Sequence, residues 1–211
     1  MPLYDYIATL AHYPIKPHHL PIPSFNIING GAHSGNALAF QEFMILPVGA
    51  SNFREAMRVA SEVYQSLKKI IAQRYGTDSV NVGDEGGFAP NITNCESSHA
   101  CHPAMHSVYT ALDLILDAVR ASGYEGKVKI ALDVAASEFY DRESKRYNLL
   151  KKVKGSGEEG KVDAATLLGI YEKLVEEYPI EVIEDGFDED DFEGWHAMRE
   201  KLGARSDGEK G

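Results

Sequence analysis

Two carboxylates of this 211-residue chain follow apolar runs that are typical of buried strands. Asp133 comes directly after the run 130–132, and Glu184 comes directly after 180–183. A charge at the end of a buried strand is costly unless it is paired or holds a metal. Because carboxylates offer only oxygen ligands, the pair favours a hard cation such as Mg²⁺. The alternative interpretation is that each residue simply begins a loop.

Two glycine-rich loops carry further candidates. Segment 83–87 reads Gly-Asp-Glu-Gly-Gly and displays Glu85. Glycine admits backbone conformations that other residues resist, which lets the chain approach a ligand closely. His33 lies in the second loop, and Glu42 follows nine residues later, so both could face one site. A plain acidic turn at 83–87 and a solvated loop histidine are the alternatives.

The surrounding pattern predicts the elements that must position these side chains. The clearest helix covers 53–75, because apolar residues recur there at spacings of three and four. Asn52 and Glu55 have the spacing of a capping box at its start, and Gly76 is a suitable C-terminal cap. Strands are predicted at 25–29, 39–46, 128–133 and 180–184, further helices at 111–121, 163–178 and 192–202, and a polar loop at about 141–161.

The resulting order, ββαα followed by two βα units, predicts an α/β fold. Alternating strands and helices imply parallel strands with helices outside, as in a barrel or a doubly wound sheet. In a barrel the carboxyl ends of the strands carry the site. Prolines make 13–23 an extended lead-in. Residues 93–110 show neither helical nor strand periodicity and are expected to be irregular and poorly ordered.

The composition excludes several classes of protein. The chain has 21 basic and 32 acidic residues and a net charge of −11. Such a surface repels nucleic acid and anionic membranes, so neither is an expected partner. No apolar run approaches the ~18 residues of a membrane span, and the first residues lack the features of a signal peptide. Two cysteines indicate cytosolic usage rather than a disulfide framework, so we expect a cytoplasmic protein.

A zinc-binding module is a separate hypothesis for segment 93–110. Its candidate ligands are Cys95, His99, Cys101, His102 and His106. The cysteine spacing, C-x5-C, is wider than the usual C-x2–4-C of zinc sites. We therefore interpret both cysteines as inert or loop thiols.

Several stretches of the chain resemble enolase, the glycolytic phosphopyruvate hydratase. The resemblance covers about 1–92 and 111–202, and the matching motifs occur in the family's order. They are FNIINGGAHSG at 25–35, QEFM at 41–44, VGDEGGFAPN at 82–91, ALDVAASEF at 131–139 and IED at 183–185.

The resemblance implies an Mg²⁺-dependent lyase that dehydrates 2-phosphoglycerate to phosphoenolpyruvate. It implies that Glu85 donates a proton to the departing hydroxyl and that His33 and Glu42 line the substrate site. Asp133 and Glu184 would bind Mg²⁺. Enolase-superfamily sites use a Lys or His base, with Mg²⁺ stabilising the enediolate. The implied partners are the two small molecules and, as in the family, a second copy in a homodimer.

The implied fold is a partial enolase-type (β/α)₈ barrel with a ββαα start and about four barrel strands. We expect one partial barrel domain at 1–202, with an irregular insertion at about 93–110 and a disordered tail at 203–211. The matched motifs include neither the family's N-terminal domain nor its third metal carboxylate and lysine base. Gly186 stands where the family has proline. We therefore expect a truncated enolase that is impaired or inactive; the alternative is a non-catalytic fragment that binds Mg²⁺ or a partner chain.

Overall fold

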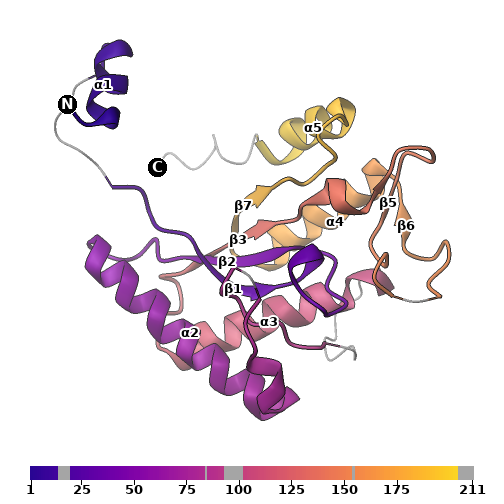
Figure 1. Ribbon diagram of the computed structural model, residues 1–211, viewed down its shortest axis with the longest axis horizontal. Coiled ribbons are helices and arrows are strands. Elements are labelled where there is room, and N and C mark those ends of the chain that lie inside the picture. The colour runs from indigo at the N-terminus through magenta and orange to yellow at the C-terminus, as the bar shows by residue number, and fades with distance from the viewer. Residues whose placement is uncertain (14–19, 84, 93–101, 154, 204–211) are drawn as a thin grey trace.

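The computed structural model describes residues 1–13, 20–83, 85–92, 102–153 and 155–203 (Figure 1). Its helices are α1 (Leu3–Leu10), α2 (Phe53–Tyr75), α3 (His106–Ala121), α4 (Ala164–Glu177) and α5 (Phe192–Met198). Its strands are β1 (Phe25–Asn29), β2 (Glu42–Leu46), β3 (Lys129–Asp133), β4 (Tyr140–Asp141), β5 (Arg146–Asn148), β6 (Lys161–Val162) and β7 (Ile180–Glu184).

The main sheet has four strands in the order β1-β2-β3-β7. β2 runs antiparallel to both β1 and β3, whereas β3 and β7 are parallel. The predicted antiparallel start and the later parallel pair in one sheet are therefore confirmed. The α/β class is confirmed as well, although β2 begins at Glu42 rather than at residue 39.

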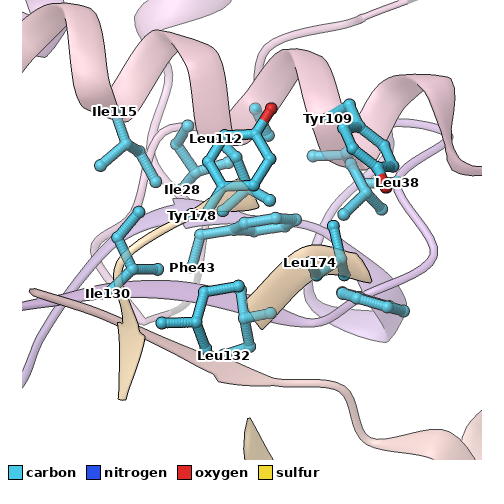
Figure 2. Close-up of a cluster of buried hydrophobic side chains, with 14 of the residues drawn as sticks. Ile28, Leu38, Phe43, Tyr109, Leu112, Ile115, Ile130, Leu132, Leu174 and Tyr178 are labelled. Carbon is cyan, nitrogen blue, oxygen red and sulfur yellow. The ribbon is translucent and has the colours of Figure 1, made fainter. Parts of the chain in front are cut away.

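The core fills the space between this sheet and the helices that pack on it. Figure 2 shows Tyr109, Leu112 and Ile115 of α3 beside Phe43 and Leu132 of the sheet. All five side chains are at most 2% exposed. Because side chains alternate between the two faces of a strand, burying Phe43 and Leu132 directs their chain neighbours to the opposite face. The apolar pattern thus fixes which face receives the acidic side chains.

Helix α2 has the predicted bounds and the predicted cap. The Asn52 side chain accepts a hydrogen bond from the Glu55 amide at 3.0 Å, and Glu55 Oε2 accepts one from the Ser51 amide at 2.9 Å. These bonds satisfy amides that a helix start leaves without intrahelical partners. At the other end Gly76 has φ +86°, a conformation that favours glycine.

The prediction that 93–110 is irregular is wrong in the part that the structure describes. A short 3-10 turn leads into α3, which begins before the predicted helix. Met105 and Tyr109 are 0% and 2% exposed. Met105, Tyr109 and Leu112 are spaced four and three apart, so they extend the apolar stripe of α3 backwards into the core. Residues 93–101 lie outside the described residues.

The predicted polar loop at 141–161 is also wrong, because this region forms a second, three-stranded antiparallel sheet of β4, β5 and β6. We call residues 140–162 the excursion. Tyr147 of β5 is fully buried, and its ring centroid lies 6.2 Å from that of Phe139 and 5.8 Å from that of Phe187. Strands of two or three residues are too short to show the alternation on which sequence prediction depends.

The two ends of the chain differ in how they meet the body. Helix α1, which the sequence did not predict, has no buried residue and lies apart from the sheet (Figure 1). At the other end α5 passes into a π-helical turn at Arg199–Gly203, so Gly203 is helical, and the rest of the predicted tail lies outside the described residues. Within the described part of the chain, no helix is long and apolar enough to span a membrane.

Candidate active site

Four polar side chains form a row across the main sheet, at the end of the sheet where β3 and β7 finish. The pairing register sets Asn29 of β1 opposite Glu42 of β2, Glu42 opposite Asp133 of β3, and Asp133 beside Glu184 of β7. Laterally paired residues of a sheet point to the same face. Because β2 runs against its neighbours, its first residue lies beside the last residues of the other strands. The structure therefore brings Glu42, Asp133 and Glu184 together.

The glycine-rich loop is fastened alongside β1 and carries Glu85 to this row. The amide of Gly83 donates to the carbonyl of Gly87 at 2.8 Å, which closes the loop. The amide of Asn29 donates to the carbonyl of Phe88 at 2.8 Å, which holds the loop against β1. These bonds place Glu85 at the same end of the strands as the row of polar side chains.

Two asparagines of β1 hold the Glu85 carboxylate. Nδ2 of Asn29 donates to Oε2 of Glu85 at 3.1 Å, and Nδ2 of Asn26 donates a longer bond to the same atom at 3.4 Å. Their Oδ1 atoms are buried without a hydrogen-bond partner among the described residues. A Cβ at Gly87 would lie 2.4 Å from the Asn29 Oδ1, so only glycine fits this position.

Glu42 is the most perturbed acid of the row. Burial, a hydrogen bond with Glu85 and the charges of Glu85, Asp133 and Glu184 raise the pKa of Glu42 to about 8. A carboxyl group with such a pKa carries a proton at neutral pH, which is the state required of a general acid. The Glu42–Glu85 pair therefore holds a proton at neutral pH.

Asp133 is held by local hydrogen bonds. Its two oxygens accept from the Ala135 amide at 3.0 Å and from Nε2 of Gln41 at 3.1 Å. Burial raises the pKa of Asp133, these two hydrogen bonds oppose the rise, and the charges of Asp185 and Glu85 add to it. The carboxylate is thus oriented while remaining in an environment that disfavours its charge.

Glu184 lies in a similar environment at the end of β7. Partial burial and the charges of Asp133 and Asp185 raise the pKa of Glu184. The backbone at both Ala135 and Asp185 has φ +48°, a left-handed conformation that Asp tolerates better than Ala. At Ala135 this conformation is strained, and strained backbone of this kind costs about 1–3 kcal/mol and clusters at functional sites. Ala135 lies two positions after Asp133.

The carboxylate oxygens at this end of the strands are suitable ligands for Mg²⁺. Asp133 and Glu184 offer oxygen ligands only, and each lies among negative charges that a cation would offset. Mg²⁺ is commonly held by one or two carboxylates, with water and substrate phosphate completing the shell. Among the described residues, no group of three or more His, Cys, Asp or Glu side chains is arranged to hold a metal, so the two carboxylates would supply only part of the ion's shell.

Two other sequence candidates are only partly described. The backbone of His33 ends a 3-10 helix, Gly31–His33, in the loop between β1 and β2, but its side chain lies outside what the structure describes. Of the suggested zinc ligands, Cys95, His99 and Cys101 lie outside the described residues, so that hypothesis stays a prediction.

Sequence reasoning missed four polar residues at the site: Asn26, Asn29, Gln41 and Asp185. The only local signal was that two asparagines interrupt the apolar strand FNIIN. Gln41 contacts Asp133 across 92 positions of the chain, a relationship that no local spacing reveals.

The fold and the site define an α/β barrel-type domain with an acidic site at the carboxyl ends of its parallel strands. The family model described as "Enolase, C-terminal TIM barrel domain" matches residues 17–207, and the chain belongs to this family. The chain is 48% identical to Enolase 1 of Entamoeba histolytica over 198 residues, which is 93% of this chain and 42% of that protein. It is 44% identical to Enolase of Eimeria tenella over 205 residues, which is 97% of this chain and 43% of that protein. The chain thus spans less than half the length of these curated relatives.

Proposed function

We propose that this chain contributes the general acid and two metal-binding carboxylates to an enolase that dehydrates 2-phosphoglycerate. One observation carries the proposal: Glu42, Asp133 and Glu184 lie in register in one row, and Glu85 is hydrogen-bonded to Glu42. Membership of the enolase family supports the choice of this reaction. As further parts of this proposal, the partners are 2-phosphoglycerate and phosphoenolpyruvate, and the compartment is the cytoplasm.

The reaction passes a proton from C2 of the substrate to the family's lysine base, which lies outside the matched motifs, and removes a hydroxyl group from C3. Glu85 donates a proton to the departing hydroxyl, which leaves as water, and its neighbour Glu42 supports it with the shared proton. His33 and Glu42 line the substrate site. Asp133 and Glu184 would hold Mg²⁺, which, when bound, offsets the negative charge that develops on the substrate carboxylate.

For the chain on its own we expect slow turnover or none. The motifs shared with the family contain carboxylates and a histidine but no lysine base, and a positioned base is typically worth ~10²–10⁴-fold in rate. The second candidate function is a non-catalytic fragment that binds Mg²⁺ or a partner chain. The position of β7 at the end of the sheet favours it, because among the described strands β7 pairs only with β3 and its Val182 is 43% exposed.

Fragment complementation tests the proposal. The purified chain is assayed with excess Mg²⁺ and 2-phosphoglycerate, alone and mixed with the remainder of Entamoeba histolytica Enolase 1 outside the aligned region. We expect phosphoenolpyruvate only from the mixture, and its loss with Glu85→Gln but not with Glu181→Gln, a change at an exposed position of β7. Failure of the mixture, together with absence of Mg²⁺ binding by the chain, would contradict the proposal. Mg²⁺ binding without activity would favour the second candidate.

A further inference from the structure

The loop that leads from β1 to the row of acids is held by a lysine from a distant part of the chain. Nζ of Lys152, in the excursion, donates to the carbonyl of Ser34 at 2.6 Å and to the carbonyl of Gly31. These bonds join positions 118 and 121 residues apart. The two carbonyls flank His33, so one ammonium group holds both sides of the segment that carries this candidate residue.

The charged group of Lys152 donates its hydrogen bonds to carbonyl groups. Within the described residues it forms no ion pair with a carboxylate, although the chain carries a net charge of −11. Partial burial lowers the pKa of Lys152, so the position is unfavourable for an ammonium group in its own right. Hydrogen bonds from a charged donor are the stronger kind, and here they offset that unfavourable burial.

The loop and the excursion do not close tightly on each other at this point. A cavity of about 300 Å³ lies between them, lined by Ala37 and Ala39 on the loop side, by Leu149 of the excursion and by Phe139, which directly precedes the excursion. Side chains that do not touch across a cavity make no dispersion contacts with each other. The polar contacts of Lys152 therefore matter more for holding the loop than they would across a filled interface.

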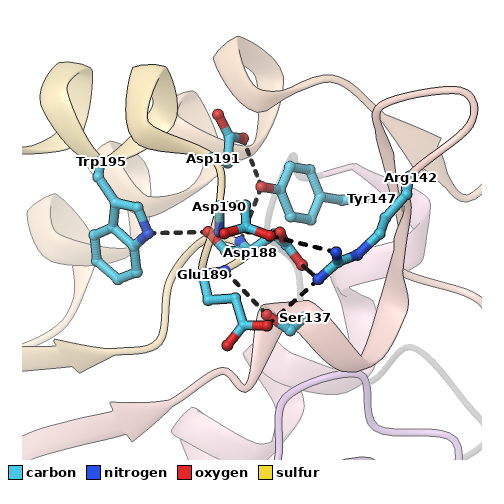
Figure 3. A network of polar contacts seen from close by, with 8 residues as sticks. All are labelled: Ser137, Arg142, Tyr147, Asp188, Glu189, Asp190, Asp191 and Trp195. Carbon is cyan, nitrogen blue, oxygen red and sulfur yellow. Dashed lines mark hydrogen bonds and ion pairs between the residues drawn. The ribbon is translucent and has the colours of Figure 1, made fainter.

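The excursion is itself firmly anchored. Figure 3 shows Tyr147 and Arg142 of the excursion facing the segment that follows β7. The Tyr147 hydroxyl donates to Asp191 at 2.6 Å and accepts from the Asp188 amide at 3.0 Å. Arg142 lies 3.3 Å from the Asp190 carboxylate. Lys152 thus projects from a supported platform towards the loop.

A continuous series of hydrogen bonds runs from Lys152 to Glu85. Ser34, whose carbonyl accepts from Lys152, donates its hydroxyl to Oδ1 of Asn36 at 2.6 Å. Nδ2 of Asn36 donates to the carbonyl of Asn29 at 2.9 Å, and Nδ2 of Asn29 donates to Glu85 at 3.1 Å. Each link belongs to a different part of the site, so a shift at one end has a direct route to the other.

We propose that Lys152 is a positioning residue, which fastens the 31–34 loop to the excursion and so fixes the hydrogen-bond series that orients Glu85. We call the two hydrogen bonds from Lys152 to the loop the latch. The importance of Lys152 for catalysis rests on the function proposed above, whereas the existence of the latch does not. Lys151 provides a matched control, because its Nζ donates to the carbonyl of Glu138 near the excursion itself and not to the loop.

Hydrogen exchange of the full chain tests the latch without any assay of activity. With Lys152→Met we expect amide exchange of peptides covering 30–38 to accelerate by at least about tenfold, since even one of the two lost charge-assisted hydrogen bonds is worth that factor. The side-chain amide signal of Asn29 in ¹H–¹⁵N spectra should also shift. Lys151→Met should change neither readout. Because neither depends on turnover, failure of the latch and failure of the proposed function are distinguishable.

Chemical rescue separates positioning from general damage. Lys152→Cys, alkylated with 2-bromoethylamine, regains an ammonium group at nearly the original length and should recover slow exchange at 30–38. The wild-type chain is treated identically, because Cys95 and Cys101 also carry thiol groups. Unchanged exchange in Lys152→Met, equal acceleration in Lys151→Met, acceleration spread evenly over the whole chain, or absence of rescue would each overturn the proposal.

Discussion

Glu42 and Asp133 are direct cross-strand partners, the first at the start of β2 and the second at the end of β3. Directly opposed side chains of an antiparallel pair have Cβ atoms about 4.5–5.5 Å apart, and like charges in that position are destabilising. The sheet relieves this repulsion when one of the two acids holds a proton or when a cation binds beside them. The stability of the fold is therefore tied to the chemistry of the site.

Stability should fall as the pH rises towards 8, because of Glu42. Its pKa moves from 4.5 in the unfolded chain to about 8 in the fold. The folded state thus binds the proton more tightly, and this contribution, complete below pH 4.5, is lost as the pH rises through about 8. Glu42→Gln should remove about 1–2 kcal/mol of the pH-dependent loss, after allowance for solvent screening. Urea unfolding in EDTA at pH 6 and pH 9 measures it.

Glu181→Gln is the control for this prediction. Glu181 lies on β7 with its side chain 58% exposed, at 4.0 Å from Lys129. Its removal should leave the slope of stability against pH unchanged. Parallel curves for the wild-type chain and Glu42→Gln would show that Glu42 does not hold the extra proton.

Millimolar Mg²⁺ should stabilise the chain through Asp133 and Glu184. A ligand that binds only the folded state adds RT ln(1 + [L]/Kd), about 1.4 kcal/mol at tenfold excess over Kd. Asp133→Asn or Glu184→Gln should abolish the increase in melting temperature. An increase that survives both substitutions would place the ion elsewhere, and a melting temperature indifferent to Mg²⁺ would rule out a usable site.

Met105→Ala should cost far more stability than Met57→Ala. Met105 is fully buried beneath the start of α3, whereas Met57 on α2 is 46% exposed. Removing a buried methionine costs about 2–5 kcal/mol, and a surface change usually stays within about 0.5 kcal/mol. Denaturant unfolding of the two variants compares the same chemical change at both positions. Equal costs would contradict the packing of residues 102–110 into the core.

Tyr147→Phe should destabilise the excursion by about 1–3 kcal/mol. The substitution keeps the buried ring but removes the hydroxyl that serves Asp191 and the Asp188 amide, leaving a buried donor unpaired. Tyr140→Phe is the matched control, since the described contacts include no hydrogen bond of the Tyr140 hydroxyl. Calorimetric melting measures the stability lost in each variant. An equal loss in Tyr147→Phe and Tyr140→Phe would contradict the prediction.

Local patterns in the sequence were sufficient for the larger elements. Helix α2 follows from the spacing of its apolar residues. Its cap follows from one hydrogen bond between the Asn52 side chain and the amide of Glu55, three residues later. The strands that end at Asp133 and Glu184 follow from short apolar runs. The same patterns failed where elements are very short, as in the excursion, and where a helix starts among polar residues, as at His106.

The sequence by itself determined that acids stand at the ends of two strands and on a glycine loop, because these are facts of neighbouring residues. Only the tertiary structure decided that Glu42 opposes Asp133, that Glu85 shares a hydrogen bond with Glu42, and that Lys152 reaches the 31–34 loop. Strand register, burial and contacts across a hundred residues depend on how the whole chain packs. The pKa of a carboxyl group follows from that packing, because burial and neighbouring charges set it.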